Sequence, residues 1–424
     1  MNKRKWAALV VAACLCMPLP AAAENGVPEE TIARDVLTWD KNLAAVWYEV
    51  EVFDEKQDDL PADAPSDAHV YDNAHVYVNS LIVEPMRQWK SDGDFYWRVR
   101  AFDLDGNPIT PFSPLVHEDG PAPEDRNAPA IRNEANKAGI STLLYPVYSY
   151  TWIPGAAKYE VEVTAGRPEN PGGISPSVKR VWSHVTELTD LYDDLPRIGS
   201  YAWRVRGLAA DGSPVGVWSK AQSFETDPDT GWKVAVFGDS ISHGGGHLSY
   251  APTDWEYGYP AYFHFKSINL SESGDTSEMM VARFEQDVLP FHPKYLLIMG
   301  GSNSLRADVP AESVIHDLAA IQQKCRDHGI VPILLTLPPI NPANIRKAFQ
   351  EDTVPDWKEK FEAVNSWIRT QPHIDTAAPF LYMEEMPTDL ALDGLHGDYD
   401  AKAMMAEEIN AHIGEFTGNE ELDP

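Results

Sequence analysis

The chain has 424 residues, of which 43% are hydrophobic and 23% are charged, and this composition excludes a largely disordered protein. The length is sufficient for several domains. The formal net charge of −31 would repel a phosphate backbone, so we expect no nucleic-acid partner.

The N-terminal segment 1–23 is predicted to be a secretory signal peptide. Three basic residues at 3–5 precede an apolar run, and three alanines end the segment before Glu24. The apolar run is too short for a stable membrane span, so we expect no transmembrane anchor. Cys14 could be the lipid-bearing cysteine of a lipoprotein, but the apolar run continues beyond it, which favours cleavage after the alanines. We therefore expect a secreted, periplasmic or cell-surface protein.

An internal repeat organises the first half of the chain. Residues 48–52 recur as 159–163, and residues 97–100 recur as 203–206. Apolar and polar residues alternate in all four segments, which is typical of half-buried strands. An Asp-Gly turn follows the second motif in each copy. The repeat therefore predicts two similar β-domains.

These two units resemble fibronectin type III domains, which are β-sandwiches of about 100 residues. The resemblance rests on the repeated strand motifs and on a tryptophan upstream of each copy, Trp39 and Trp152. We assign the two predicted domains to residues 24–120 and 139–227. As modules of an exported protein, they are candidates for contact with a polysaccharide or the cell wall.

From residue 232 onward, short apolar runs alternate with helical periodicities. The runs at 233–237, 295–299 and 331–337 predict strands, and the amphipathic segments between them predict helices. Such alternation predicts a parallel sheet covered by helices on both faces, a flavodoxin-like α/β/α domain. Functional sites of such domains lie at the carboxyl ends of the strands. Cys325 falls on an apolar helical stripe and is expected to be a buried structural thiol.

A Gly-Asp-Ser turn directly after the first of these strands contains Ser240. Such a turn can hold a serine nucleophile clear of the sheet edge. A hydroxyl nucleophile needs a base, and the base needs an orienting carboxylate; the segment 393–396 supplies both. We predict that Ser240 attacks an ester carbonyl, that His396 accepts and returns its proton, and that Asp393 orients the imidazole. Taken singly, Ser240 would be a turn residue and His396 a surface or capping residue. Only the combination of the three residues favours a catalytic role.

Two further loops supply donors for a tetrahedral oxyanion. The candidates are the backbone amides of Ser240 and Gly274 and the side-chain amide of Asn303. The order Ser, Gly, Asn and Asp-x-x-His within residues 232–416 is similar to the SGNH hydrolases, also called the GDSL esterase/lipase family. This resemblance implies a catalytic triad, an oxyanion hole of these three residues and no cofactor. Ser304 stands where the family usually has aspartate, which puts the support of that loop in question.

Aromatic and histidine side chains follow the nucleophile. Trp255, Tyr257 and Tyr259 either contact a sugar ring or an acyl group, or pack their loop against the domain; both interpretations remain open. His243 and His247 lie on a glycine-rich loop without a nearby acidic or cysteine partner. We therefore expect no metal site.

The predicted function is that of an exported serine esterase that removes small acyl groups, acetate above all, from a carbohydrate or cell-envelope glycan. A lipase, lysophospholipase-type or short-chain ester hydrolase is the closest alternative. An acyltransferase that uses the same serine, and a non-catalytic glycan-binding protein on an SGNH scaffold, also remain open. The identity of the substrate does not follow from the sequence.

Overall fold

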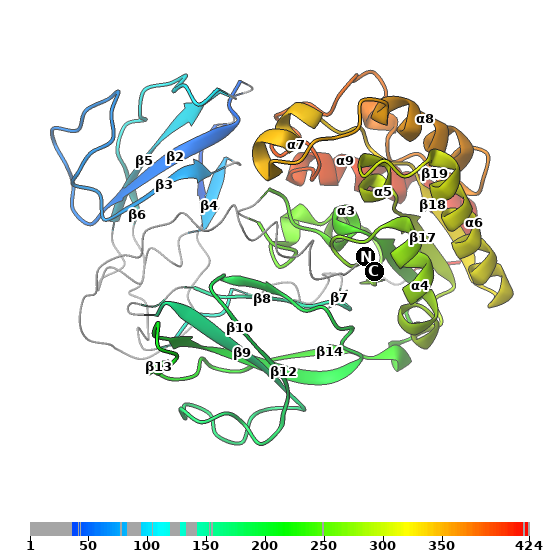
Figure 1. Cartoon of the computed structure of the whole chain (residues 1–424), viewed down its shortest axis with the longest axis horizontal. Coiled ribbons are helices and arrows are strands. Elements are labelled where there is room, and N and C mark those ends of the chain that lie inside the picture. Colours follow the sequence, from blue (N-terminus) through cyan, green and yellow to red (C-terminus); the bar gives the residue numbers. More distant parts are fainter. Residues whose placement is uncertain are drawn as a thin grey trace.

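The computed structural model describes residues 36–40, 42, 44–76, 79–82, 95–103, 105–118, 128–132, 142–151, 153, 156–247, 250–418 and 420–422. The predicted signal peptide, Cys14 and Trp152 lie outside these residues. The described part of the chain forms two β-domains and a larger α/β domain. Figure 1 shows the first β-domain beside helix α7 (Pro342–Phe349) and the second β-domain on another side of the α/β domain.

The first β-domain contains a four-stranded antiparallel sheet and a two-stranded pair. The sheet has the order β3-β2-β5-β6, with β2 Trp47–Phe53, β3 Tyr71–Val76, β5 Phe95–Phe102 and β6 Val116–Glu118. The pair consists of β1 (Val36–Thr38) and β4 (Ser80–Ile82). The ring of Trp39 packs against Tyr48 and Trp97, with centroids 5.2 and 5.9 Å apart. This tryptophan therefore packs against the core of the domain.

The second β-domain repeats this plan. Its five-stranded sheet has the order β10-β9-β12-β13, and β14 also pairs with β12. The strands are β9 (Lys158–Thr164), β10 (Arg180–Thr186), β12 (Gly199–Leu208), β13 (Pro214–Val215) and β14 (Gln222–Thr226). A separate pair joins β8 (Val147–Ser149) to β11 (Asp190–Tyr192). Both N-terminal domains are thus β-rich, as predicted. Their identity as fibronectin type III domains stays a prediction.

The repeated motifs form paired neighbours in both domains, β2 with β5 and β9 with β12. Their polar residues, however, are not exposed. Arg98 and Glu51 lie 2.5 Å apart and buried, and the guanidinium lies over the Phe112 ring. Arg204 and Glu162 repeat this buried pair at 2.6 Å. The prediction of half-buried strands is therefore wrong for the face that carries these charged residues. Loops and aromatic rings cover this face, and ion pairs compensate its buried charges.

The α/β domain is built on a six-stranded sheet of order β19-β18-β17-β15-β16-β7 in which every pairing is parallel. The strands are β7 (Thr142–Leu143), β15 (Val234–Gly238), β16 (Ser267–Asn269), β17 (Tyr295–Met299), β18 (Val331–Leu335) and β19 (His373–Ile374). All residues of β15 and β17 are buried, as expected for strands covered on both faces. The predicted parallel sheet is confirmed.

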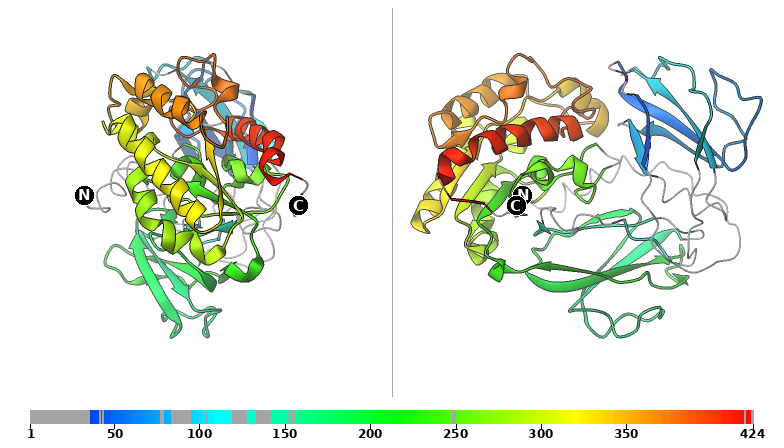
Figure 2. Two further views of the ribbon diagram at one scale, coloured as in Figure 1. Left: turned by 90° about the vertical axis from the view of Figure 1, so that its right-hand side faces the viewer. Right: turned by 180° about the vertical axis from the view of Figure 1, so that it is seen from behind.

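Helices cover both faces of this sheet. Figure 2 shows α4 (Ser277–Asp287) and α6 (Ala311–Asp327) on one side and α9 (Tyr399–His412) on the other. The other α-helices are α3 (Ser240–His243), α5 (Ser302–Arg306), α7, α8 (Trp357–Ile368) and α10 (Gly414–Thr417). Single 3-10 turns lie at Pro228–Thr230, Trp255–Tyr257, Tyr259–Tyr262, Leu289–Phe291 and Ala378–Phe380. Cys325 lies on the buried face of α6 in the core, as predicted.

The edge strand β7 comes from the segment that precedes the second β-domain. Thr142 and Leu143 pair with β16, and the amide of Leu144 donates to the carbonyl of Asn269 at 2.8 Å. The predicted second β-domain began at residue 139, so this boundary needs correction: residues 142–144 belong to the α/β sheet. A two-residue strand carries no hydrophobic period, which is why the sequence did not predict it. The pairing covers an edge that would otherwise present unpaired amides.

Candidate active site

The predicted catalytic segments follow the carboxyl ends of three neighbouring strands. Ser240 begins α3 directly after β15, Gly274 lies in the loop after β16, and Asn303 lies in α5 just after β17. Since β16, β15 and β17 are adjacent and parallel, these loops share one edge of the sheet. Asp393 and His396 lie in the loop before α9. The topology therefore brings four segments that are distant in sequence to one place.

The three predicted triad residues form a continuous hydrogen-bonded chain. His396 Nε2 lies 2.8 Å from Ser240 Oγ, and His396 Nδ1 lies 2.8 Å from Asp393 Oδ2. Asp393 is fully buried and also accepts the backbone amides of Leu395 and His396 at 2.7 Å each. These bonds fix the carboxylate so that it receives the Nδ1 proton, which leaves Nε2 free to accept the serine proton.

Burial alone would raise the pKa of Asp393, but the charge of His396 and its hydrogen bonds outweigh this effect and hold the pKa at about 2. The group is therefore a carboxylate at neutral pH, as an orienting residue requires. The rings of Phe349 and His396 form a T-shaped pair, with centroids 6.1 Å apart. This aromatic contact, which was not predicted, packs against the imidazole from the end of α7.

The nucleophile turn is shaped by its neighbours. Gly238 leaves no room for a side chain, because a Cβ there would lie 2.3 Å from the Met299 carbonyl oxygen. Asp239 caps α3 by accepting the Ile241 amide at 3.1 Å. The buried ammonium of Lys402 donates to the Ile241 carbonyl at 2.6 Å, from α9. Lys402 was not predicted, because a single lysine in a helical segment carries no motif that marks such a role.

Burial dominates the protonation of both charged groups beneath the serine. It raises the pKa of Asp239 to about 6, against the lowering effect of the Ile241 amide. It lowers the pKa of Lys402 to about 8, against the charges of Asp239 and Asp393. A buried ammonium thus lies within electrostatic range of the cap residue and of the triad carboxylate.

The candidate oxyanion donors are held by backbone contacts. Gly274 has a φ of 88°, a left-handed conformation that favours glycine. One N–H of the Asn303 amide donates to the Asp275 carbonyl at 2.9 Å, which places this amide beside the Gly274 loop and leaves its second N–H for a substrate oxygen. The Glu272 amide donates to the Gly238 carbonyl at 3.1 Å and so ties this loop to the nucleophile turn.

Ser304, the departure from the family pattern, has a structural role. Its hydroxyl accepts the backbone amide of Ser277 at 3.0 Å and lies 3.2 Å from the Ser277 hydroxyl. Ser277 in turn donates to Asp317 of α6 at 2.6 Å. Ser304 therefore satisfies a backbone donor in the first turn of α4, and a carboxylate still joins the network from a different helix.

The aromatic residues after the nucleophile differ in burial. Tyr259 is fully buried, and its hydroxyl lies 2.8 Å from Ser242 Oγ. Tyr257 is buried and stacks on Tyr250 with centroids 4.1 Å apart. The packing interpretation therefore describes these two tyrosines. Trp255 is half-buried near Tyr262, and its contact with substrate stays a prediction.

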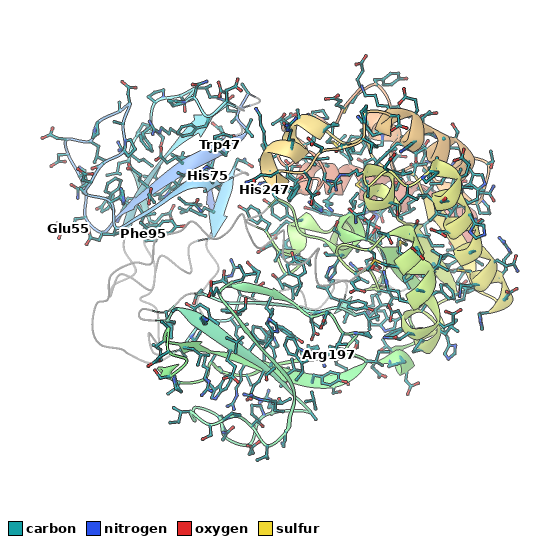
Figure 3. The ribbon with its side chains drawn as sticks, in the orientation of Figure 1. Trp47, Glu55, His75, Phe95, Arg197 and His247 are labelled. Atoms are coloured by element: carbon teal, nitrogen blue, oxygen red, sulfur yellow. The ribbon has the colours of Figure 1, made fainter. Side chains whose placement is uncertain are left out.

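The two histidines of the glycine-rich loop are both buried. His243 contacts Tyr145 and Ser273, 2.8 Å from each. Burial is the main cause that lowers the pKa of His247 to about 3; the charges of His396 and His75 act in the same direction, and Asp393 opposes them. His247 thus lies between the triad and the first β-domain. Figure 3 shows it at the side of the α/β domain nearest His75.

Within the described ranges, no helix is both long and apolar enough to cross a membrane. Residues 236–399 match the GDSL-like Lipase/Acylhydrolase family. This range includes Ser240, Gly274, Asn303, Asp393 and His396. The predicted family is therefore confirmed for this part of the chain.

The uncharacterized lipoprotein YqeF of Bacillus subtilis is 32% identical to this chain over 130 residues. The match covers 26% of this chain and 50% of that relative, so the chain spans about half the length of the curated relative it matches. A GDSL-like lipase from Bacteroides thetaiotaomicron is 19% identical, covers 44% of this chain and 90% of its own, and has a TM-score of 0.36. An acetylxylan esterase from Geobacillus stearothermophilus is 20% identical, with coverages of 43% and 94% and a TM-score of 0.34. The family assignment rests on the sequence match alone.

Proposed function

We propose, from the premise that residues 236–399 belong to the GDSL-like lipase/acylhydrolase family, that this protein is an exported serine esterase. It hydrolyses small acyl esters, acetyl esters above all, on a carbohydrate or cell-envelope glycan. The observation that carries the proposal is the chain of two 2.8 Å contacts from Ser240 through His396 to Asp393. This arrangement supports nucleophilic acyl transfer.

Each residue of this hydrogen-bonded triad has its own role in the reaction. Ser240 Oγ attacks the ester carbonyl while His396 Nε2 takes its proton. Asp393 stabilises the imidazolium that forms. The amides of Ser240, Gly274 and Asn303 donate to the oxyanion of the tetrahedral intermediate. The intermediate then expels the alcohol, which takes the proton from His396. A water molecule attacks the acyl-enzyme by the same steps and releases the carboxylic acid and Ser240.

The exposure of the site supports an ester carried on a larger molecule. Ser240 is half-buried, and the His396 side chain is 17% exposed. A Cβ placed on Gly274 would meet no atom within 4 Å, so space is open beside this donor. A small acyl group can enter such a site while the alcohol part stays outside.

Export is supported by the composition of the N-terminal segment 1–23, and the printed name of the Bacillus subtilis relative describes a lipoprotein. Both features favour a secreted, periplasmic or cell-surface location, with cleavage after the alanines favoured over lipid attachment at Cys14. Substrates outside the cytoplasm include acylated glycans. The two β-domains are the proposed contacts for such a polymer.

The test is hydrolysis of p-nitrophenyl acetate by the purified protein. We expect Ser240→Ala to lower kcat by at least about a thousandfold, because the nucleophile is lost. Ser366→Ala, which changes an exposed serine of α8, is the matched control and should retain the full rate. Equal rates for the wild type and Ser240→Ala would rule out the serine mechanism.

A series of acyl chains from acetyl to octanoyl separates the proposed substrate class from its rivals. A steep fall in kcat/KM with chain length supports deacetylation, whereas a flat or rising profile indicates a lipase-type enzyme. Acetate release from acetylated glycans, measured in the presence and absence of an acceptor alcohol, distinguishes hydrolysis from acyl transfer. An acylated acceptor as the main product would identify a transferase.

A further inference from the structure

The loop that carries Gly274 is held on both sides by side chains that the family motifs do not include. We call residues 271–276 the oxyanion loop. Ser273 precedes Gly274, and its hydroxyl lies 2.8 Å from His243 Nδ1. Asp275 follows Gly274, and its carboxylate accepts from the Arg283 guanidinium. The backbone amide expected to bind the oxyanion therefore lies between two fixed neighbours.

The contacts of His243 define its tautomer. Its Nε2 lies 2.8 Å from the carbonyl oxygen of Tyr145, which can only accept, so Nε2 carries the proton. Nδ1 then accepts the hydroxyl proton of Ser273. Burial lowers the pKa of His243 to about 4, with a further lowering by the charge of Arg283. The imidazole is therefore neutral at physiological pH and binds both partners at once.

Arg283 joins the other side of the oxyanion loop to the strand ends. It is buried, and it donates to the carbonyls of Leu270 and Gly238 at 2.6 and 2.9 Å. It also donates to the carboxylate of Asp287 at 2.9 Å. One guanidinium thus connects the oxyanion loop, the end of β15 and the helix α4.

Tyr145 contacts both of these side chains. Its carbonyl accepts from His243, its ring lies 5.6 Å from the Arg283 guanidinium, and its hydroxyl donates to Asp287 at 2.7 Å. It is 3% exposed and comes two residues after β7, so it lies outside the range 236–399 that matches the family. The segment that completes the edge of the sheet thus also reaches the oxyanion loop.

We propose that Tyr145 is a positioning residue that acts through His243 and Arg283 to fix both sides of the oxyanion loop. The segment before the second β-domain then forms part of the working esterase site. This inference rests on the proposed function, because the loop needs fixing for catalysis only if Gly274 binds an oxyanion. Donors stabilise developing charge when they are held in place beforehand, and a shift of about 1 Å can cost up to about a hundredfold in rate.

The experiment compares Tyr145→Phe with Tyr148→Phe. Both changes remove a hydroxyl that donates to a buried carboxylate at 2.7 Å, but the partner of Tyr148 is Asp193, within the second β-domain. We expect Tyr145→Phe to lower kcat for p-nitrophenyl acetate about tenfold with KM changed by less than about twofold, because the loop acts on the transition state. Tyr148→Phe should retain the wild-type kcat.

A second pair of variants tests the other side of the loop. Ser273→Ala removes the hydroxyl that donates to His243, whereas Ser273→Thr keeps it. We expect kcat to fall about tenfold in the alanine variant and to return to within about twofold of the wild type in the threonine variant. Hydrogen exchange of the backbone amides of residues 271–276 should be faster in Ser273→Ala and Tyr145→Phe than in the wild type.

The outcomes separate this inference from the proposed function. If Tyr145→Phe and Ser273→Ala match Tyr148→Phe in both kcat and loop exchange, the positioning role is wrong. If the wild type hydrolyses no ester but exchange at 271–276 still depends on Tyr145, the proposed function is wrong and the structural link stands. If Tyr145→Phe fails to fold, the two Ser273 variants decide the question.

Discussion

At the scale of single residues, the environment of Ser240 includes a buried ammonium. Lys402 donates to the Ile241 carbonyl one residue after Ser240, and its positive charge lies within range of two buried carboxylates, Asp239 and Asp393. Buried charges are tolerated when opposite charges and hydrogen bonds compensate them. The positive charge of Lys402 therefore offsets part of the negative charge of the carboxylates around the turn that contains Ser240.

We expect Lys402→Met to destabilise the protein by about 1–3 kcal/mol, because it leaves the buried Ile241 carbonyl without its donor and removes a cation near Asp239 and Asp393. Urea unfolding measures this change. The control is Lys294→Met, which removes an exposed ammonium paired with Glu420 and should leave the stability close to that of the wild type. A loss below about 1 kcal/mol for Lys402→Met would contradict the argument.

The candidate catalytic residues could be selected from the sequence, whereas the residues that contact and position them could not. Ser240 lies in a short motif just after β15, and Asp393 and His396 share a second short motif before α9. Tyr145 contacts His243 through a backbone carbonyl, which any residue type possesses, so no pattern of side chains marks it. Lys402 stands alone on α9 without a motif.

At the scale of elements, the paired strands of the two β-domains repeat a buried ion pair. Glu162 contacts Arg204 at 2.6 Å and Arg180 at 2.5 Å, and the Trp218 ring lies 4.6 Å from the Arg204 guanidinium. The alternation of residues correctly predicted strands at these positions. It could not predict that these charged side chains are buried. Charged residues of an alternating strand usually face solvent, and only tertiary contacts with other segments bury them.

We expect Arg204→Met to destabilise the second β-domain by about 3–5 kcal/mol, since Glu162 remains buried with one of its two partners missing. The double variant Glu162→Gln, Arg204→Met should recover part of this loss, because the unpaired charge is removed. Urea unfolding of the two variants and the wild type measures the difference. A double variant less stable than Arg204→Met would contradict the explanation.

At the scale of the whole molecule, β7 joins the chain before the second β-domain to the α/β sheet. The parallel sheet was predicted correctly, but the two-residue strand β7 comes from residues that the prediction placed in the second β-domain. The hydroxyl of Tyr399 also donates to Asn79 of the first β-domain at 2.8 Å. Contacts of this kind depend on how the domains pack, and they leave no local signal in the sequence.

Acidification is expected to destabilise the molecule through its buried histidines. The folded pKa values of His243 and His247 are about 4 and 3, below the usual 6.5, because burial disfavours the charged imidazole. Between pH 6.5 and about 4 the unfolded chain therefore binds protons that the folded protein does not, and stability falls as the pH falls. Asp239 opposes this trend, since burial raises its pKa to about 6 and the folded state takes up its proton first.

The two histidines and the one carboxyl act in opposite directions, so the unfolded state binds about one more proton than the folded state. The free energy of unfolding should therefore fall by about 1.4 kcal/mol per pH unit as the pH decreases through this window. Unfolding in urea at pH 7, 6 and 5 measures the slope at constant ionic strength, which holds the screening of the net charge of −31 constant. His243→Asn should reduce the slope by about one proton, because asparagine does not titrate. His292→Asn, which removes an exposed imidazole outside the site, is the matched control. An unchanged slope in His243→Asn would show that the pKa of this imidazole is the same in the folded and unfolded states, which would contradict its burial as a neutral group between Tyr145 and Ser273.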